Sequence, residues 1–315
     1  MRFARQIQFP VYTFLAGLFG LLLHGCTLRN EVDPGLLGID SSKIVVSGYL
    51  SPQDTMLAIR VTRTQTVVGD SLNLLETGII VPNAKVTLSE GDRSIVLPFY
   101  KVNPPADSAY SIDARLLPIV AGHTYKLTVE TPAGQRLSST CTIPQAVLPK
   151  SILFDSLTQT QSRATIQRHY VRTRWQDPAG QTNYYQVAGI FRYSSITNFR
   201  DEKYSSLSFD DDNRGLFSDA GVDGTIMVSG RAYLTSVASA TNVSTSFSNQ
   251  YSTASVTVNL MSVEPTYYRF QEAIIRQRRA RNNPFAEPVL IPSNIQGGLG
   301  CFAGYNNATL TMTLK

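Results

Sequence analysis

Catalytic sites often contain a histidine, or a serine within a recognised motif. This sequence has three histidines and none of the common catalytic motifs. Only His123 and His169 lie beyond the N-terminal segment. Neither is near a cysteine or has the glutamate spacing of a metal site. The G-x-S-x-G turn of hydrolases, the glycine-rich phosphate loop and the H-E-x-x-H zinc motif do not occur. We therefore expect structural histidines, no catalytic residue, no metal, no cofactor, and a protein that is not an enzyme.

One acidic run is a candidate for cation binding. It comprises Asp210-Asp211-Asp212-Asn213, followed by Asp219 and Asp223. Carboxylate oxygens suit Ca²⁺, but the run lacks the glycine and the closing glutamate of an EF-hand. A calcium-binding loop over Asp210–Asp223 and a solvated turn both stay open, and the turn is favoured.

The densest positive charge is the cluster Arg276, Arg278, Arg279 and Arg281. Such a cluster would bind phosphate or anionic lipid, or would form the polar face of a helix. The polar face is the favoured interpretation.

Aromatic pairs occur at Tyr184-Tyr185 and Tyr267-Tyr268. If exposed, they would suit stacking against sugar rings. In a strand or helix, one ring of each pair enters the core and the other lies at its rim, which is the favoured interpretation. Trp175, the only tryptophan, is expected in the core.

The N-terminus has the layout of an export signal. Arg2 and Arg5 precede an uncharged run from Phe9 to Leu23, and Leu23-His24-Gly25-Cys26 follows. This tetrapeptide resembles the bacterial lipobox, at which the chain is cut before a cysteine that carries lipid. We expect a signal peptide over residues 1–25 and lipidation of Cys26. The alternative is an ordinary signal with a chance cysteine.

Lipid rather than a helix is the expected membrane anchor. The apolar run of about fifteen residues is shorter than the roughly twenty that a spanning helix needs. Each acyl chain would contribute about 0.8 kcal/mol per buried methylene. Residues 26–42 are polar, contain proline and glycine, and are expected to form a flexible tether.

Composition favours an all-β protein of two domains. Removing 25 of 315 residues leaves 290, and the formal charge of +5 falls to +3 when Arg2 and Arg5 leave. That charge is too mild for a nucleic-acid partner. The hydrophobic share of 43% with 16% charge suits half-buried strands. Cys141 and Cys301 lie in different predicted domains, so two buried thiols are favoured over a disulfide.

The first predicted domain, residues 43–146, has the pattern of an immunoglobulin-like or transthyretin-like sandwich. Short strands alternate in polarity, as in Leu57, Ile59 and Val61. Gly91-Asp92 and Pro132-Ala133-Gly134 separate pairs of strands by hairpin-length turns. The proline-containing segment from Ile143 to Pro149 is expected to close the domain.

The second predicted domain, residues 147–315, is β-rich with one helix near residues 265–281. Its predicted strands are Ile152–Leu157, Tyr170–Trp175, Tyr184–Tyr193, Thr225–Leu234, Ser255–Met261 and Ala308–Leu314. The helix rests on Tyr267, Phe270, Ile274 and Ile275 at helical spacing after Pro265. Residues Thr235 to Ser255 are expected to form a mobile loop or weak edge hairpin.

The C-terminal fifty residues carry the most specific pattern, in two blocks. These are Asn283-Pro284-Phe285-Ala286-Glu287-Pro288-Val289 and Ser293-Asn294-Ile295-Gln296-Gly297-Gly298-Leu299-Gly300-Cys301-Phe302. They closely resemble the signature of the domain-of-unknown-function family 4249, and shorter blocks along nearly the whole chain agree. The glycines predict positive φ angles or a close approach of two chains. Cys301 stands where the family usually has an apolar residue, which supports a buried thiol.

The resemblance implies an outer-membrane lipoprotein of Bacteroidota, often encoded beside TonB-dependent transporters and without established activity. The leading hypothesis is a binding or accessory component that captures nutrients with such a transporter. The second is a structural or assembly protein of the cell envelope that makes protein contacts only. The third, a glycan hydrolase, would need a pair of carboxylates in one cleft.

Overall fold

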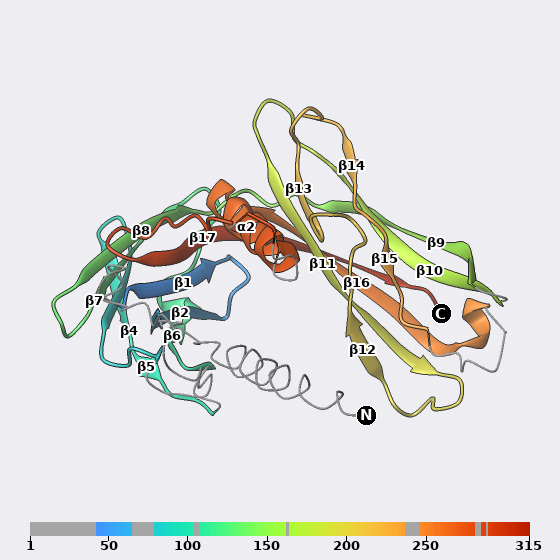
Figure 1. Ribbon diagram of the computed structural model, residues 1–315, viewed down its shortest axis with the longest axis horizontal. Helices are drawn as coiled ribbons and strands as arrows, with labels where there is room; N and C mark the ends of the chain where they lie inside the picture. The colour runs from blue at the N-terminus through green and yellow to red at the C-terminus, as the bar shows by residue number, and fades with distance from the viewer. Residues whose placement is uncertain are drawn as a thin grey trace, which may run out of the picture. The chain divides into compact units, whose positions relative to one another are not determined.

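The computed structural model describes residues 42–64, 79–103, 107–161, 164–236, 246–280, 285–287 and 289–315. The predicted signal peptide, Cys26 and nearly all of the tether lie outside these ranges. In the first half, the strands are β1 (Ile44–Leu50), β2 (Met56–Arg63), β3 (Lys85–Glu90), β4 (Arg93–Leu97), β5 (Phe99–Tyr100), β6 (Ala109–Asp113), β7 (Thr124–Glu130) and β8 (Arg136–Thr142), with a 3₁₀ turn at Ala114–Leu116 (Figure 1).

The second half of the described chain contains further strands and one α-helix. They are β9 (Pro149–Gln161), β10 (Ala164–Gln176), β11 (Tyr184–Ser195), β12 (Lys203–Ser206), β13 (Leu216–Ser218), β14 (Ile226–Val228), β15 (Ala232–Tyr233), β16 (Tyr251–Val263), α2 (Pro265–Ala280) and β17 (Leu299–Thr313), with a 3₁₀ turn at Phe247–Asn249. The predicted fold class, all-β with sandwich-like packing and one helix, is confirmed. The immunoglobulin-like or transthyretin-like assignment stays a prediction.

Three sheets organise these strands. The largest has nine strands in the order β12-β11-β16-β17-β1-β2-β6-β5, with β13 also paired to β11. A second has the order β4-β3-β7-β8. In the third, β10 pairs with β14 and β15 along one edge and with β9 along the other.

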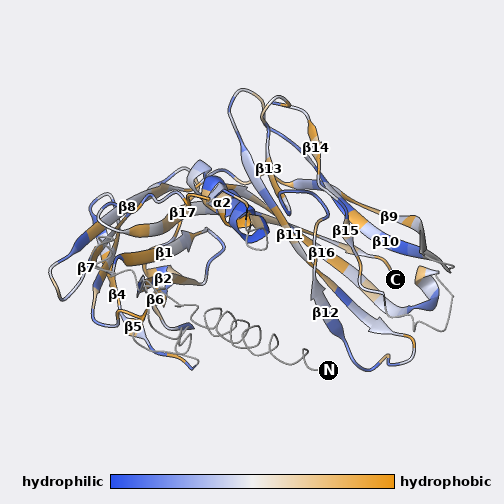
Figure 2. Ribbon diagram, viewed as in Figure 1, coloured by the Kyte–Doolittle hydropathy of each residue, from blue (hydrophilic) through white to orange (hydrophobic). Residues whose placement is uncertain are grey.

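The first core lies between the β1-β2-β6 part of the large sheet and the β4-β3-β7-β8 sheet. Leu57, Ile59 and Val61 are buried while their neighbours in β2 face outward, as the alternation predicts. Tyr125, Leu127 and Val129 enter the same core from β7. Figure 2 shows the corresponding change from apolar to polar residues along several strands.

The predicted hairpins of this sandwich are confirmed. Glu90 pairs with Arg93 across Gly91-Asp92, and Gly91 has φ +54°. β7 and β8 pair antiparallel from Thr124↔Thr142 to Glu130↔Arg136.

A second core lies between the β9-β10 sheet and the β11-β16 part of the large sheet. Trp175 is fully buried there, as expected, and its ring lies edge-on to Tyr185 and Phe217 at centroid distances of 5.4 and 5.5 Å. Val256, Val258 and Leu260 of β16 complete this core.

β17 joins the two halves of the chain. It pairs parallel with β1 from Val45↔Leu299 to Leu50↔Gly304 and antiparallel with β16 from Ser255↔Thr313 to Val263↔Tyr305. The large sheet thus combines strands from both predicted domains, and all described residues belong to one compact unit. The predicted boundary at residues 146 and 147 stays a prediction about independent folding.

Glycines of the C-terminal signature permit close contacts of this segment with β1 and β8. Gly300 has φ +119°, and a Cβ atom there would lie 1.9 Å from the carbonyl oxygen of Val46. A Cβ on Gly297 (φ +79°) would lie 2.7 Å from the carbonyl oxygen of Arg136. Both predicted features, positive φ and close approach, are therefore present.

Several predicted strands differ in extent from the structure. The segment Thr225–Leu234 forms β14 and β15, because Ser229 leaves the regular ladder and its Oγ accepts from the backbone N–H of Thr173. β17 begins nine residues before the predicted Ala308. β16 begins at Tyr251, inside the expected loop, of which residues 237–245 lie outside the description.

Candidate functional site

Helix α2 packs on the large sheet beside β1 and β17. Tyr267 of α2 lies edge-on to Tyr49 of β1, with ring centroids 5.3 Å apart. Cys301 and Ala303 of β17 are fully buried in the same apolar cluster. The first half of β17 is therefore covered on both faces, because neighbouring Phe302 packs into the first core.

The tyrosine pairs divide between core and rim. Tyr185 and Tyr267 are buried, whereas Tyr184 and Tyr268 are half-buried and lie against each other with centroids 4.9 Å apart. The Tyr267 hydroxyl donates to the Oε1 of Gln186. This placement confirms the favoured interpretation and leaves neither pair as an open platform for sugar stacking.

Glu264 links three elements at the start of α2. It follows β16 directly, and its Oε1 accepts from the backbone N–H of Thr142 in β8 at 3.1 Å. Its Oε2 accepts from the backbone N–H of Gly304 in β17 at 3.0 Å. Burial raises the pKa of this carboxyl group, and the two backbone donors partly oppose that effect. The backbone carbonyl of Glu264 also accepts the helical bond from Tyr268.

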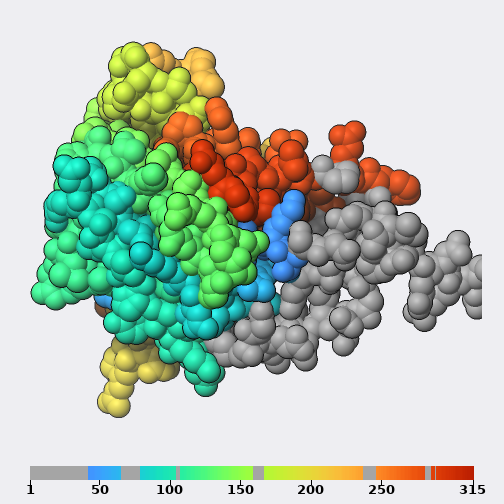
Figure 3. All heavy atoms as spheres, turned by 90° about the vertical axis from the view of Figure 1, so that its left-hand side faces the viewer, coloured from blue at the N-terminus to red at the C-terminus, as the bar shows by residue number. Residues whose placement is uncertain are grey.

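A polar pocket of about 490 Å³, which we call the α2 pocket, opens beside Glu264. β7 and β8 form one wall, and the start of α2 and the signature segment 294–296 form the other. The lining side chains are polar or charged: Lys126, Ser138, Ser139, Thr140, Glu264, Thr266, Asn294 and Gln296. In Figure 3 the green residues around β7 and β8 adjoin the orange and red residues of the C-terminal segment.

The signature segment forms its wall through hydrogen bonds to both neighbouring strands. The backbones of Ser138 and Gln296 exchange two hydrogen bonds of 3.2 and 2.8 Å. The Asn294 amide donates to the carbonyl of Phe302 and accepts from its N–H, at 2.6 and 3.0 Å. The Ser139 hydroxyl donates to the Asn294 carbonyl at 2.9 Å. The wall is thus an ordered part of the fold.

The described lining residues offer hydrogen-bonding groups and one side chain of each charge, Lys126 and Glu264. They include no histidine or cysteine, and the serine hydroxyls donate to acceptors within the wall. Sequence reasoning missed the pocket, although the dipeptide Glu264-Pro265 between a strand and a helix marks one side of it.

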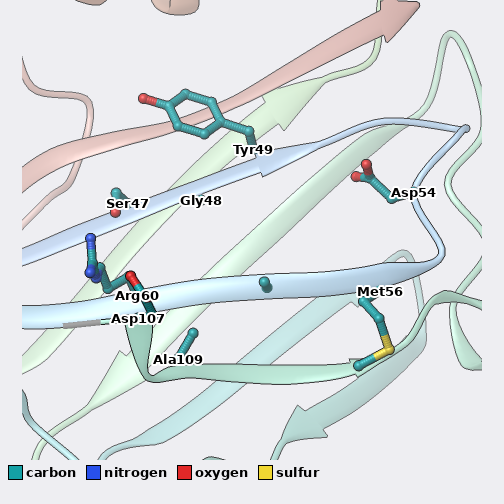
Figure 4. Close-up of a pocket in the computed structure, with 9 residues that line it drawn as sticks. Ser47, Gly48, Tyr49, Asp54, Met56, Arg60, Asp107 and Ala109 are labelled. Atoms are coloured by element: carbon teal, nitrogen blue, oxygen red, sulfur yellow. The ribbon is translucent and has the colours of Figure 1, made fainter. Parts of the chain in front are cut away.

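A second groove, of about 440 Å³, crosses the outer face of β1, β2 and β6 (Figure 4). Tyr49, Met56 and Arg60 line it, and Asp54 and Asp107 lie at opposite ends. Asp54 accepts from the Tyr305 hydroxyl at 3.2 Å and from the backbone N–H of Ser51. Burial raises the pKa of Asp54.

The predicted acidic run is divided by the fold. Asp210 accepts from the backbone N–H of Arg231, Asp211 accepts from that of Gly215, and Asp212 is almost fully exposed. These three residues serve a turn, as the favoured interpretation expects.

Asp219 and Asp223 instead meet Asp177, a residue outside the run. Their carboxylate oxygens lie within 4.8 Å of one another, which is close enough to hold a metal ion. Each already accepts a backbone hydrogen bond, from Asn183 to Asp219, from Gly180 to Asp223 and from Gly224 to Asp177. Asp177 also accepts from the buried Tyr185 hydroxyl at 2.5 Å. The cluster therefore has a structural role in joining two loops.

The two histidines lie outside the α2 pocket and the second groove and contact other side chains. His123 is exposed, with its Nδ1 at 2.5 Å from the Oε1 of Glu90. His169 lies against Phe154 and Phe247, with ring centroids 5.8 and 5.1 Å away, and burial lowers its pKa.

The arginines of α2 form an exposed, polar end of the helix. Arg276, Arg278 and Arg279 are exposed. The Nη2 atom of Arg279 lies 3.5 Å from the Oδ1 atom of Asp212. Arg281 lies outside the described residues.

Cys141 and Cys301 are free and buried. Burial raises the pKa of Cys301 to about 12 and raises that of Cys141 further. Both thiols therefore stay protonated and are poor nucleophiles.

Among the described helices, none has the length and apolarity to span a bilayer.

Comparison with known proteins places the chain in a family. No curated protein matches the sequence. A family model described as "Domain of unknown function (DUF4249)" matches residues 29–311, a range that holds Tyr49, Glu264, the α2 pocket and both signature blocks. Because this match spans most of the sequence, the chain belongs to the family described as domain of unknown function DUF4249.

Proposed function

We propose that this protein is a lipid-anchored, non-enzymatic binding protein of the outer membrane in Bacteroidota. It works with a TonB-dependent transporter in nutrient capture or uptake. The observation that carries the proposal is Leu23-His24-Gly25-Cys26 after an apolar run too short to span a bilayer. Lipid on Cys26 anchors the chain, and residues 26–42 act as its tether.

The side chains of the β-rich body support binding rather than catalysis. The α2 pocket is lined by hydrogen-bonding groups, and its volume of about 490 Å³ lies within the range of roughly 300–1,000 Å³ for small-molecule sites. Both histidines have structural contacts, and Asp54 and Asp107 of the second groove lie at its opposite ends.

The test compares the native chain with Cys26→Ala in a related bacterial host, with Thr27→Ala as the matched control. Membranes are fractionated, and proteins crosslinked to the native form are identified. We expect the native form and Thr27→Ala in the outer membrane with a transporter, and Cys26→Ala released from it. Outer-membrane retention of Cys26→Ala would contradict the lipid anchor, and a native form crosslinked to no transporter would contradict the accessory role.

A second candidate function is an envelope scaffold that makes protein contacts only. It is favoured by β9, a strand of 13 residues that pairs, among the described strands, with β10. An open strand edge can accept a strand from another protein. A scaffold would crosslink to proteins but would show no saturable binding of small ligands.

A further inference from the structure

The α2 pocket contains two opposite charges that do not neutralise each other. Lys126 enters from β7 and Glu264 from the start of α2. Neither takes part in an ion pair within the described residues. Glu264 is held by two backbone N–H groups, which orient the carboxylate but carry no full charge that would neutralise it.

The other lining side chains are uncharged hydroxyl and amide groups that can donate hydrogen bonds. Thr140 and Thr266 carry hydroxyl groups, and Gln296 has an amide nitrogen while its Oε1 accepts from Ser138. The described lining residues include no aromatic and no aliphatic side chain, so they offer neither a stacking platform for a sugar nor a surface for an apolar ligand.

From this arrangement we propose that the α2 pocket binds a zwitterionic ligand, a short peptide with free ends. Its carboxylate pairs with Lys126 and its ammonium group pairs with Glu264, while the threonine hydroxyls and the Gln296 amide bind the peptide groups between them. The pocket volume of about 490 Å³ accommodates a few residues. This inference rests on the proposed binding function and names the class of ligand.

The ligand itself provides the first test. Full-length protein in detergent is titrated by calorimetry with triglycine and, separately, with N-acetyl-triglycine amide, which has the same backbone but no charged end. We expect saturable binding of triglycine and at least tenfold weaker binding of the blocked peptide, because charge-assisted hydrogen bonds are lost. Equal affinities, or no saturable binding of triglycine, would overturn the proposal.

Matched variants locate the site. Lys126→Gln removes one charge from an exposed position, and Lys85→Gln does the same on β3, outside the pocket. We expect about tenfold weaker triglycine binding for Lys126→Gln and native affinity for Lys85→Gln. Glu264→Gln keeps one acceptor for the backbone and should weaken binding similarly. Native affinity in Lys126→Gln would place the peptide elsewhere and overturn the proposal.

These outcomes are separable from those for the proposed function. If triglycine does not bind while a transporter is still crosslinked, the ligand class is wrong and the accessory role stands. If triglycine binds at Lys126 and no transporter is crosslinked, the site stands and the transporter partnership fails.

Discussion

Glu264 shows how one side chain can hold several elements together. Its carboxylate accepts from the backbones of β8 and β17, and its own backbone starts α2. Removing the carboxylate leaves two N–H groups without their partner. Gly304 is buried whereas Thr142 is exposed, and a buried donor left without its acceptor costs about 1–3 kcal/mol.

We therefore expect Glu264→Leu to lower the free energy of unfolding by about 1–3 kcal/mol, measured by urea denaturation. Gln277→Leu, at an exposed position of the same helix, is the control, and surface changes of this kind stay within about 0.5 kcal/mol. An equal effect of the two substitutions would show that the hydrogen bonds of Glu264 do not stabilise the fold.

His169 makes stability depend on pH. Burial against Phe154 and Phe247 lowers the pKa of His169 below its ordinary value of about 6.5, so the folded state prefers the neutral ring. The unfolded chain then binds the proton more readily, and the contribution of His169 is present above pH 6.5 and is lost as pH falls through its lowered pKa. We expect that, as pH falls from 7.5 to 5, the melting temperature of His169→Phe decreases less than that of the native protein. Identical pH profiles of the melting temperature would contradict this.

At the scale of elements, the signature glycines decide how closely β17 can approach β1 and β8. Gly300 combines positive φ with a neighbouring carbonyl oxygen, whereas Gly134, in the β7–β8 turn, has φ +79° with no atom within 4 Å of an added Cβ. A substitution at Gly134 therefore measures backbone strain alone, whereas one at Gly300 measures backbone strain together with steric overlap.

We expect Gly134→Ala to cost about 1–2 kcal/mol, which is the cost of a left-handed conformation alone. Gly300→Ala should cost about 2–5 kcal/mol, because a clash with the Val46 carbonyl is added to the same strain. Urea denaturation of both variants measures the difference. Equal losses would mean that β1 and β17 can separate without cost.

At the scale of the whole molecule, the last of the described strands, β17, completes a sheet that contains the first of them, β1. β1 pairs with β2 along one edge and with β17 along the other. A fragment that ends at residue 146 therefore leaves one edge of β1 without its hydrogen-bond partners and uncovers the part of the first core that Phe302 fills.

We expect the fragment 43–146 to unfold at a lower urea concentration than the same residues in the fragment 43–315. Near-ultraviolet circular dichroism of the fragment 43–146, which contains tyrosines but not Trp175, reports its tertiary packing directly. The same midpoint in both fragments would show that residues 43–146 fold independently, as the predicted domain boundary implies.

Much of the local structure follows from short-range patterns in the sequence. Alternating polarity predicted β2 and β7, the Gly91-Asp92 turn predicted a hairpin, and the spacing of Tyr267 and Phe270 after Pro265 predicted α2. Side-chain period and turn conformation are properties of neighbouring residues, so the sequence alone determined them. The lipobox at Cys26 is equally local, and it stays a prediction.

Only the tertiary structure decided which distant residues meet. Asp177 joins Asp219 and Asp223, Lys126 shares a pocket with Glu264, and β17 lies parallel to β1. The residues in each of these contacts are separated by more than 35 positions, and no local period or turn preference specifies such pairs. They form because the apolar faces of the strands are buried together, and burial depends on the whole chain rather than on any one segment.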